Sequence, residues 1–129
     1  MKKNIENIVR HSEVSEKEIE KYLCKRMKEI GLPCIKYSNA NETGYPDRLI
    51  VLPASLCVWV ELKSKGRKPT KVQQIRIAEL EKLKHAVWVI DNKPVVDELT
   101  AELRKWLEDN RAEIELYDTK KNTNSKLEL

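Results

Sequence analysis

The feature that most constrains the fold is a pair of short apolar runs, residues 49–52 and 57–60, separated by a turn around Pro53-Ala54-Ser55. Apolar runs of this length, joined by a few turn residues, predict two strands of an antiparallel hairpin. We place these strands at 48–52 and 56–63.

Both predicted strands have charged residues at one end. Asp47 follows Gly44 and Pro46 and directly precedes the first strand, whereas the second strand ends in Glu61 and Lys63. Because side chains alternate between the two faces of a strand, Glu61 and Lys63 lie on one face and their apolar neighbours on the other. Such charges need partners, since an unpaired buried charge is costly.

A divalent metal ion is the simplest partner for these groups. Mg²⁺ prefers about six oxygen ligands and usually takes one or two of them from protein carboxylates. Asp47 and Glu61 can supply two carboxylates, and the backbone carbonyl of Leu62 can supply a third oxygen. Such an ion lowers the pKa of a bound water and neutralises charge on a phosphodiester during cleavage. We interpret Lys63 as a charged group that positions the water or the phosphate, because neighbouring carboxylates oppose its deprotonation.

A helix is predicted to precede the hairpin. Ser15 and Glu18 match a capping box, the apolar residues that follow recur at helical spacing, and Gly31 marks the end. Glu16 and Glu20 fall on its apolar side, where a carboxylate either reaches solvent at the edge or points at the metal. We prefer Glu20 as this third acid and leave Glu16 open as the alternative.

A helix and a strand are predicted after the hairpin, at 70–84 and 86–90. A strand, a helix and a strand in this order indicate a right-handed parallel crossover. Thr70 and Gln73 match a capping box, which is a purely structural role for Gln73. The same glutamine shares a helix face with Ile77, so it also points inward, where it would bind the phosphate or orient a water.

With a short strand at 34–38 and a last helix opened by Pro94, the elements follow the order α-β-β-β-α-β-α. The expected fold is α/β, a mixed four-stranded sheet with flanking helices on both faces. We expect a polar lead-in at 1–14, one domain at 15–109 and a flexible polar tail at 110–129.

Five cations and no acid occupy residues 63–71, directly after the predicted metal-binding strand. A cationic loop suits a polyanion such as a nucleic-acid backbone, although an isolated basic loop is equally often merely solvated. Its position beside the carboxylates favours phosphate contact. The candidate nucleic-acid-binding residues share a positive charge and a place near the acids: Lys36, Lys65, Arg67, Lys68 and Lys71.

The 129 residues carry a net charge of +4 and include no apolar run approaching the roughly 20 residues that cross a bilayer. No apolar stretch follows Met1 either, so we expect a cytoplasmic protein with no membrane partner. Cys24, Cys34 and Cys57 lack CxxC spacing, which argues against zinc, and are expected to be buried free thiols.

Several of these motifs together resemble the PD-(D/E)xK nuclease superfamily: Gly44-x-Pro46-Asp47, Val60-Glu61-Leu62-Lys63, the basic Lys-Gly-Arg-Lys-Pro stretch and Gln73. Within it they are most similar to the virus-type replication-repair nuclease (VRR-NUC) domain, over residues 15–99. The Asp and Glu-x-Lys core alone is weak, but the combination is fairly specific. The chain departs from the common pattern at Lys84-His85, where members often carry a glycine.

The resemblance implies a restriction-endonuclease-like core and a nuclease that uses Mg²⁺ or Mn²⁺ to hydrolyse DNA phosphodiesters. The residues that it makes catalytic are Asp47, Glu61, Lys63, Gln73 and Glu20. Asp47, Glu61, Glu20 and the Leu62 carbonyl would hold the metal. Small members come typically from phages or bacteria, and some resemble Holliday-junction resolvases, which act as two-fold dimers. We therefore expect branched or junction DNA as substrate, a role in replication, repair or recombination in a phage or bacterial host cytoplasm, and a homodimer as one form.

Two other functions compete with this one. A non-catalytic nucleic-acid-binding module on the same fold would use the acids only as partners for Lys63, and it would need no divalent ion. A restriction-type endonuclease would need a base-reading element, for which 129 residues leave little room.

Overall fold

The computed structural model describes residues 14–116. It contains a single mixed sheet in the order β1-β2-β3-β4. The strands are β1 (Cys34–Lys36), β2 (Arg48–Val51), β3 (Cys57–Leu62) and β4 (Ala86–Ile90). β1, β2 and β3 pair antiparallel, and β3 pairs parallel with β4. The predicted α/β class, the hairpin and the parallel crossover are thus confirmed.

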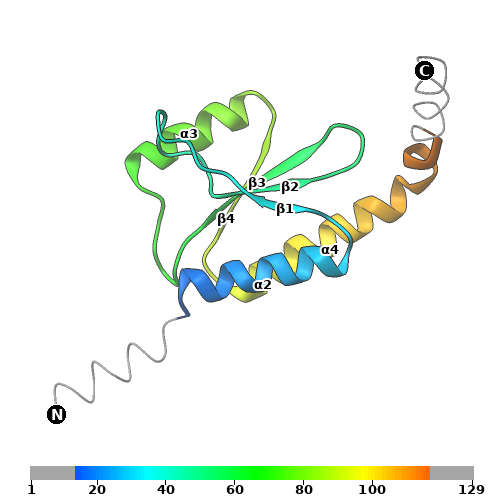
Figure 1. Cartoon of the computed structure of the whole chain (residues 1–129), viewed down its shortest axis with the longest axis horizontal. Coiled ribbons are helices and arrows are strands. Elements are labelled where there is room, and N and C mark those ends of the chain that lie inside the picture. Colours follow the sequence, from blue (N-terminus) through cyan, green and yellow to red (C-terminus); the bar gives the residue numbers. More distant parts are fainter. Residues whose placement is uncertain (1–13, 117–129) are drawn as a thin grey trace, which may run out of the picture.

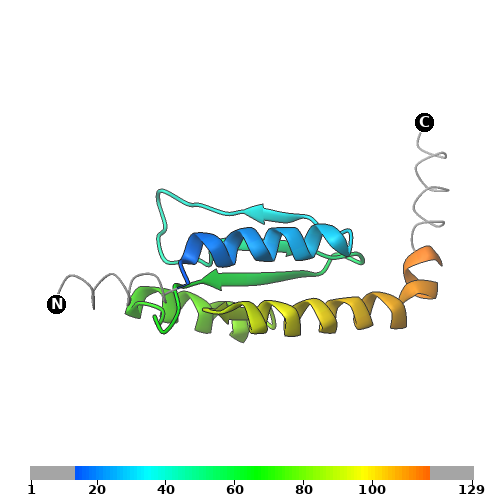
Figure 2. The ribbon, with the colours of Figure 1, turned by 90° about the horizontal axis from the view of Figure 1, so that it is seen from below.

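Helices cover both faces of the sheet (Figure 1). α2 (Glu16–Glu29) and α4 (Lys93–Asp109) run side by side along one face, as the view from below also shows (Figure 2). α3 (Lys71–Lys82) lies on the other side, against β4. No helix between residues 14 and 116 is long and apolar enough to cross a membrane.

The hydrophobic core lies between the sheet and the α2–α4 pair. Val58, Val60 and Leu62 alternate along β3 and are all buried against it. Their odd-numbered neighbours on β3 face the α3 side, as the period of two requires. This alternation is what sends Glu61 away from the core and toward α3, and it fixes the face on which the candidate site is built.

The helix starts follow the predicted capping chemistry. Ser15 Oγ accepts a hydrogen bond from the Glu18 amide at 3.1 Å, and Thr70 Oγ1 accepts one from the Gln73 amide at 3.2 Å. Both satisfy amides that have no partner inside a helix. Asn92 caps α4, so this helix begins at Lys93, one residue before the proline that we expected to open it.

The first strand is shorter than predicted. Its last hydrogen bond to β2 runs from the Tyr37 amide to the Asp47 carbonyl, at 2.8 Å. Beyond this point Asn39 Oδ1 accepts the amides of Asn41 and Glu42, both at 3.0 Å. An asparagine that bonds the following backbone in this way forms a turn instead of extending a strand.

The end of α3 also differs from the prediction, because the helix stops at Lys82 and not at 84. Lys84 has a φ of +70°, in the left-handed region that favours glycine. This residue belongs to the Lys84-His85 pair at which the sequence departs from the pattern that it resembles. Lys84 therefore adopts a strained backbone conformation at the turn into β4, away from the acids.

The structure describes only part of the predicted lead-in and of the predicted tail. Residues 111–116 are helical, and the rest of the predicted tail and the lead-in at 1–13 lie outside the described residues.

Cys24, Cys34 and Cys57 are free, as predicted, but all three are half-buried, so the expectation of full burial was wrong. Burial and the neighbouring Cys24 thiol raise the pKa of Cys34 to about 12.

Candidate active site

The register of the hairpin brings the two predicted metal-binding acids together. Arg48 pairs with Val60, so Asp47 and Glu61 occupy the next position outward on neighbouring strands. The Leu62 amide donates a hydrogen bond to Asp47 Oδ2 at 3.2 Å, which fixes that side chain against β3. Two residues that are fourteen apart in sequence thus meet at one end of the sheet.

Glu61 is the most buried charged residue of this group, with an exposed fraction of 1%. Its Oε1 accepts a hydrogen bond from Gln73 Nε2 at 3.1 Å and lies 3.5 Å from Lys63 Nζ. Burial, and then the negative charge of Asp47, raise the pKa of Glu61 to about 7. Its Oε2 is buried and has no hydrogen-bond partner in the described structure. A buried carboxylate oxygen without a partner is costly, and a cation would remove that cost.

Gln73 caps α3 and faces inward, as predicted, while its contact with phosphate or water stays a prediction. Its Oε1 accepts the Thr70 amide at 2.8 Å and so completes the capping box of α3. Its Nε2 is left free to donate to Glu61. The start of α3 is therefore fastened to the end of β3 through one amide side chain.

The first helix carries two candidate acids with different surroundings. Glu20, our preferred residue, lies 3.4 Å from the guanidinium of Arg48, which also donates to the Cys34 carbonyl at 3.1 Å. Glu16 lies one turn earlier. Burial, and then the charge of Asp47, raise the pKa of Glu16, while Lys63 acts in the opposite direction. Glu16 thus senses both Asp47 and Lys63, whereas Glu20 has a partner of its own.

A cleft of about 340 Å³ brings Asp47 together with both acids of the first helix, and it is lined by Glu16, Lys17, Glu20, Lys36 and Asp47. Lys36 therefore lies beside the candidate acids, and its contact with nucleic acid stays a prediction. Lys17 was missed by sequence reasoning, because a lysine in the first turn of a polar helix carries no distinguishing signal. Four predicted phosphate-binding residues on the loop after β3 and at the start of α3 are all exposed: Lys65, Arg67, Lys68 and Lys71.

The donor set fits a hard divalent cation. Between residues 14 and 116 no three His, Cys, Asp or Glu side chains form a ready-made metal cage. Mg²⁺ needs no such cage, because it usually takes one or two carboxylates and completes its shell with water and phosphate. The paired acids and the partnerless Glu61 oxygen meet that requirement. The predicted contribution of the Leu62 carbonyl stays a prediction.

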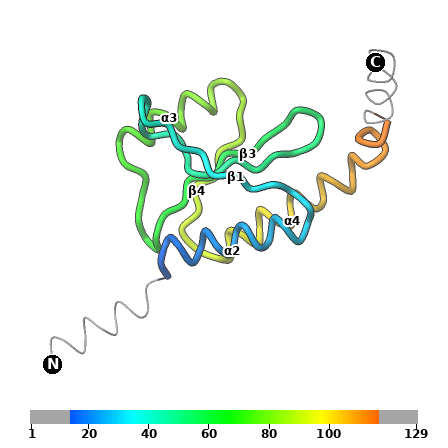
Figure 3. The backbone as a smooth tube through the Cα atoms, viewed as in Figure 1, coloured from blue at the N-terminus to red at the C-terminus, as the bar shows by residue number. Residues whose placement is uncertain are grey.

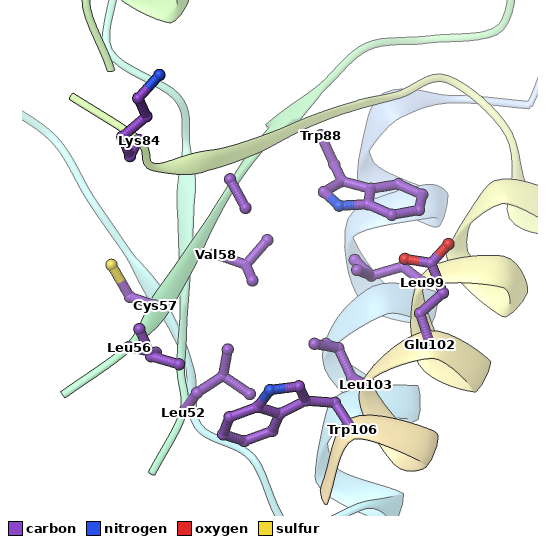
Figure 4. Close-up of a pocket in the computed structure, with 11 residues that line it drawn as sticks. Leu52, Leu56, Cys57, Val58, Lys84, Trp88, Leu99, Glu102, Leu103 and Trp106 are labelled. Atoms are coloured by element: carbon purple, nitrogen blue, oxygen red, sulfur yellow. The ribbon is translucent and has the colours of Figure 1, made fainter. Parts of the chain in front are cut away.

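A second cavity, of about 330 Å³, lies between the β2–β3 turn and α4 (Figure 4). Its walls include Leu52, Trp88, Leu103 and Trp106, and the only charged residues along it are Lys84 and Glu102. It is mainly apolar and contains none of the candidate acids.

Comparisons with known proteins identify the family. No family model matches the sequence. The chain is 36% identical over 88 residues to "Putative nuclease p44" of Acyrthosiphon pisum secondary endosymbiont phage 1, covering 68% of this chain and 95% of that protein. A solved structure described as a VRR_NUC domain matches with a TM-score of 0.62 and 29% identity, over 65% of this chain and 91% of the other. On this fold, this site and these relatives, the chain belongs to the VRR-NUC family.

Proposed function

We propose that this protein is a nuclease that hydrolyses DNA phosphodiester bonds with the help of Mg²⁺ or Mn²⁺. The observation that carries the proposal is the pairing of Asp47 with Glu61, whose Oε2 is buried without a partner and whose neighbour is the Lys63 ammonium group. A buried carboxylate beside a second carboxylate carries an electrostatic cost, which a bound cation would relieve.

Each residue of the site then has a definite role. Asp47 and Glu61 would hold the ion, and Gln73 keeps the Glu61 carboxylate in place. A bound ion would neutralise charge on the phosphate and lower the pKa of a nearby water. Lys63, whose side chain is 15% exposed, would stabilise the charge that develops on the phosphate oxygens during in-line attack.

We infer that Glu16 supplies the acid of the first helix, with Glu20 as the alternative. The charges of Asp47 and Lys63 both act on the pKa of Glu16, the first raising it and the second lowering it. Glu20 is held by Arg48, and this ion pair connects α2 to β2 beside the cleft. Glu20 would then fix the position of the helix without touching the ion.

The DNA would contact two sets of cations. Lys17 and Lys36 line the cleft, and the basic loop after β3 would supply the second set. Phosphate contacts of this kind hold the backbone without reading the sequence. We propose branched or junction DNA as the preferred substrate, in phage or bacterial replication, repair or recombination in the host cytoplasm. The phage origin of the relative supports this setting.

The test is cleavage of junction, fork, flap and linear DNA by the full chain, with Mg²⁺, with Mn²⁺ and with EDTA. Asp47→Asn, Glu61→Gln and Lys63→Gln should each abolish metal-dependent cleavage. Glu98→Gln and Lys105→Gln, at exposed positions on α4, are the matched controls and should cut like the parent. Equal cleavage by the three site variants would overturn the proposal. If the protein binds DNA but leaves it intact with both Mg²⁺ and Mn²⁺, the result would favour the non-catalytic binding module.

Two finer proposals have their own measurements. If the protein acts on four-way junctions as a two-fold dimer, sedimentation should show a dimer or its formation on junction DNA. A monomer that cuts junctions at one strand per encounter would contradict this. Discrete cuts at one linear sequence would favour the restriction-type alternative.

A further inference from the structure

We propose that Arg76 is a positioning residue of this site. It holds the segment 43–45 against α3 so that Asp47, two residues further along, faces Glu61. The inference rests on the proposed function, and it assigns a role to a residue that touches neither acid.

A single guanidinium connects α3 to the segment 43–45. Arg76 Nε donates a hydrogen bond to the Thr43 carbonyl at 3.1 Å, and the guanidinium lies over the Tyr45 ring, 4.8 Å from its centroid. Arg76 Nη1 also pairs with Glu79 on the same helix at 3.2 Å. These contacts on both sides of residue 44 hold the segment onto α3. In the view of Figure 3 the loop that follows β1 passes α3.

Gly44 shows how closely this segment lies on the helix. Its φ is +93°, and a Cβ placed there would come within 2.6 Å of Val72 Cγ1 and 3.2 Å of Arg76 Cγ. Only glycine fits such an approach of backbone to helix without a shift. The glycine that precedes Pro46-Asp47 is therefore explained by packing against α3, not only by the turn itself.

Tyr45 carries the connection on to the sheet. Its ring lies 5.9 Å from that of Tyr37, edge to face, and 6.2 Å from that of Trp59. Trp59 lies two residues before Glu61 on β3, and Tyr37 donates its amide to the Asp47 carbonyl. The aromatic side chains thus fix the segment from the sheet side while Arg76 fixes it from the helix side.

α3 consequently fixes both acids. Gln73 bonds Glu61 directly, and Arg76, one turn later, holds the segment that delivers Asp47. Ligands of Mg²⁺ must lie at about 2.0–2.1 Å in near-octahedral geometry, so small errors in the spacing of two carboxylates are costly. Lysine cannot replace this arginine, because an ammonium group lacks the planar fork that bonds and stacks at the same time.

The experiment compares Arg76→Lys and Arg76→Gln with the parent and with Lys82→Gln, which removes an exposed cation from the same helix. Mn²⁺ binding is followed by the electron paramagnetic resonance of free Mn²⁺, cleavage by kcat and KM for DNA, and folding by thermal melting. Both Arg76 variants should weaken Mn²⁺ binding and lower kcat by on the order of 10-fold, with KM for DNA little changed. Lys82→Gln should behave like the parent.

The lysine variant separates positioning from phosphate contact. If Arg76→Lys restores parental kcat and Mn²⁺ binding, or if only KM changes, Arg76 acts through its charge and the inference is overturned. Tyr45→Leu, which removes the stacked ring but keeps the arginine, is the second variant in case the first does not fold. It should shift Mn²⁺ binding in the same direction.

Failure of the proposed function gives a different result. If the parent neither binds Mn²⁺ nor cuts DNA, the nuclease proposal falls, and hydrogen exchange of the metal-free protein still tests Arg76. Arg76→Lys should then speed amide exchange in residues 43–47, while Lys82→Gln should not. Unchanged exchange there would overturn the positioning role by itself.

Discussion

Replacing Glu61 with glutamine should stabilise the metal-free protein at alkaline pH while it removes activity. The pKa of Glu61 is raised from an ordinary value of 4.5 to about 7, first by burial and then by Asp47. Below pH 4.5 the carboxyl is protonated in both the folded and the unfolded chain. Between pH 4.5 and 7 the unfolded chain releases this proton while the folded chain retains it. The free energy of unfolding therefore falls as the pH rises through this window.

The magnitude follows from the change in proton affinity. At about 1.4 kcal/mol for each tenfold change, a rise from 4.5 to about 7 costs on the order of 3 kcal/mol at pH 8. Glutamine keeps the shape of the side chain and can still accept the Gln73 hydrogen bond, but it carries no charge. We therefore expect the advantage of Glu61→Gln over the parent to grow by up to about 3 kcal/mol between pH 4.5 and 8.

The assay is urea unfolding of the parent, Glu61→Gln and the exposed control Glu98→Gln, in EDTA, across this pH range. Taking the difference between variant and parent removes the contributions that the three proteins share. Saturating Mg²⁺ should then stabilise the parent but not Glu61→Gln, because only the parent retains the ligand. A difference that does not change with pH, or a glutamine variant that is the less stable at pH 8, would refute the reasoning.

Three further predictions concern the cleft and its surroundings. Glu16→Gln should weaken Mn²⁺ binding more than Glu20→Gln does, and equal Mn²⁺ affinities of the two variants would contradict the assignment. Glu20→Gln should instead lower the free energy of unfolding by about 1 kcal/mol, because it breaks the ion pair with Arg48 on β2. Lys68→Gln with Lys71→Gln should reduce the salt slope of DNA binding by roughly 0.9 for each phosphate that the protein no longer neutralises, and an unchanged slope would place the DNA elsewhere. Gly44→Ala should cost about 1–3 kcal/mol of stability in urea unfolding, because its φ of +93° is strained for alanine, and a neutral effect would mean that the segment can move off α3.

Local signals were enough to predict the elements that position the acids. The apolar runs on either side of residues 53–55 defined the hairpin, and its antiparallel pairing is what places Asp47 beside Glu61. The two properties of Gln73, a capping position and an inward face, both reappear in its two hydrogen bonds. These features depend on neighbours within a few residues or on the alternation of a strand, and such patterns are visible in a sequence.

Other features depended on interactions between distant residues. The preference for Glu20 could not take account of Arg48, because nothing in either local pattern indicates that they pair across 28 residues. The role of Arg76 was missed for the same reason: α3 leaves apolar residues such as Val72 and Ile75 about half exposed, so its inner face is poorly marked in the sequence. The early end of β1 at Lys36 followed from the side chain of Asn39, which accepts hydrogen bonds from the amides of Asn41 and Glu42.

The central claim is that Asp47 and Glu61 hold one divalent cation. Anomalous diffraction from crystals of the full chain soaked in Mn²⁺ tests it most directly. The account predicts a peak within about 2–2.5 Å of a carboxylate oxygen from each residue, which disappears in Glu61→Gln. A peak bound elsewhere, or none at saturating Mn²⁺ with both acids ordered, would contradict it.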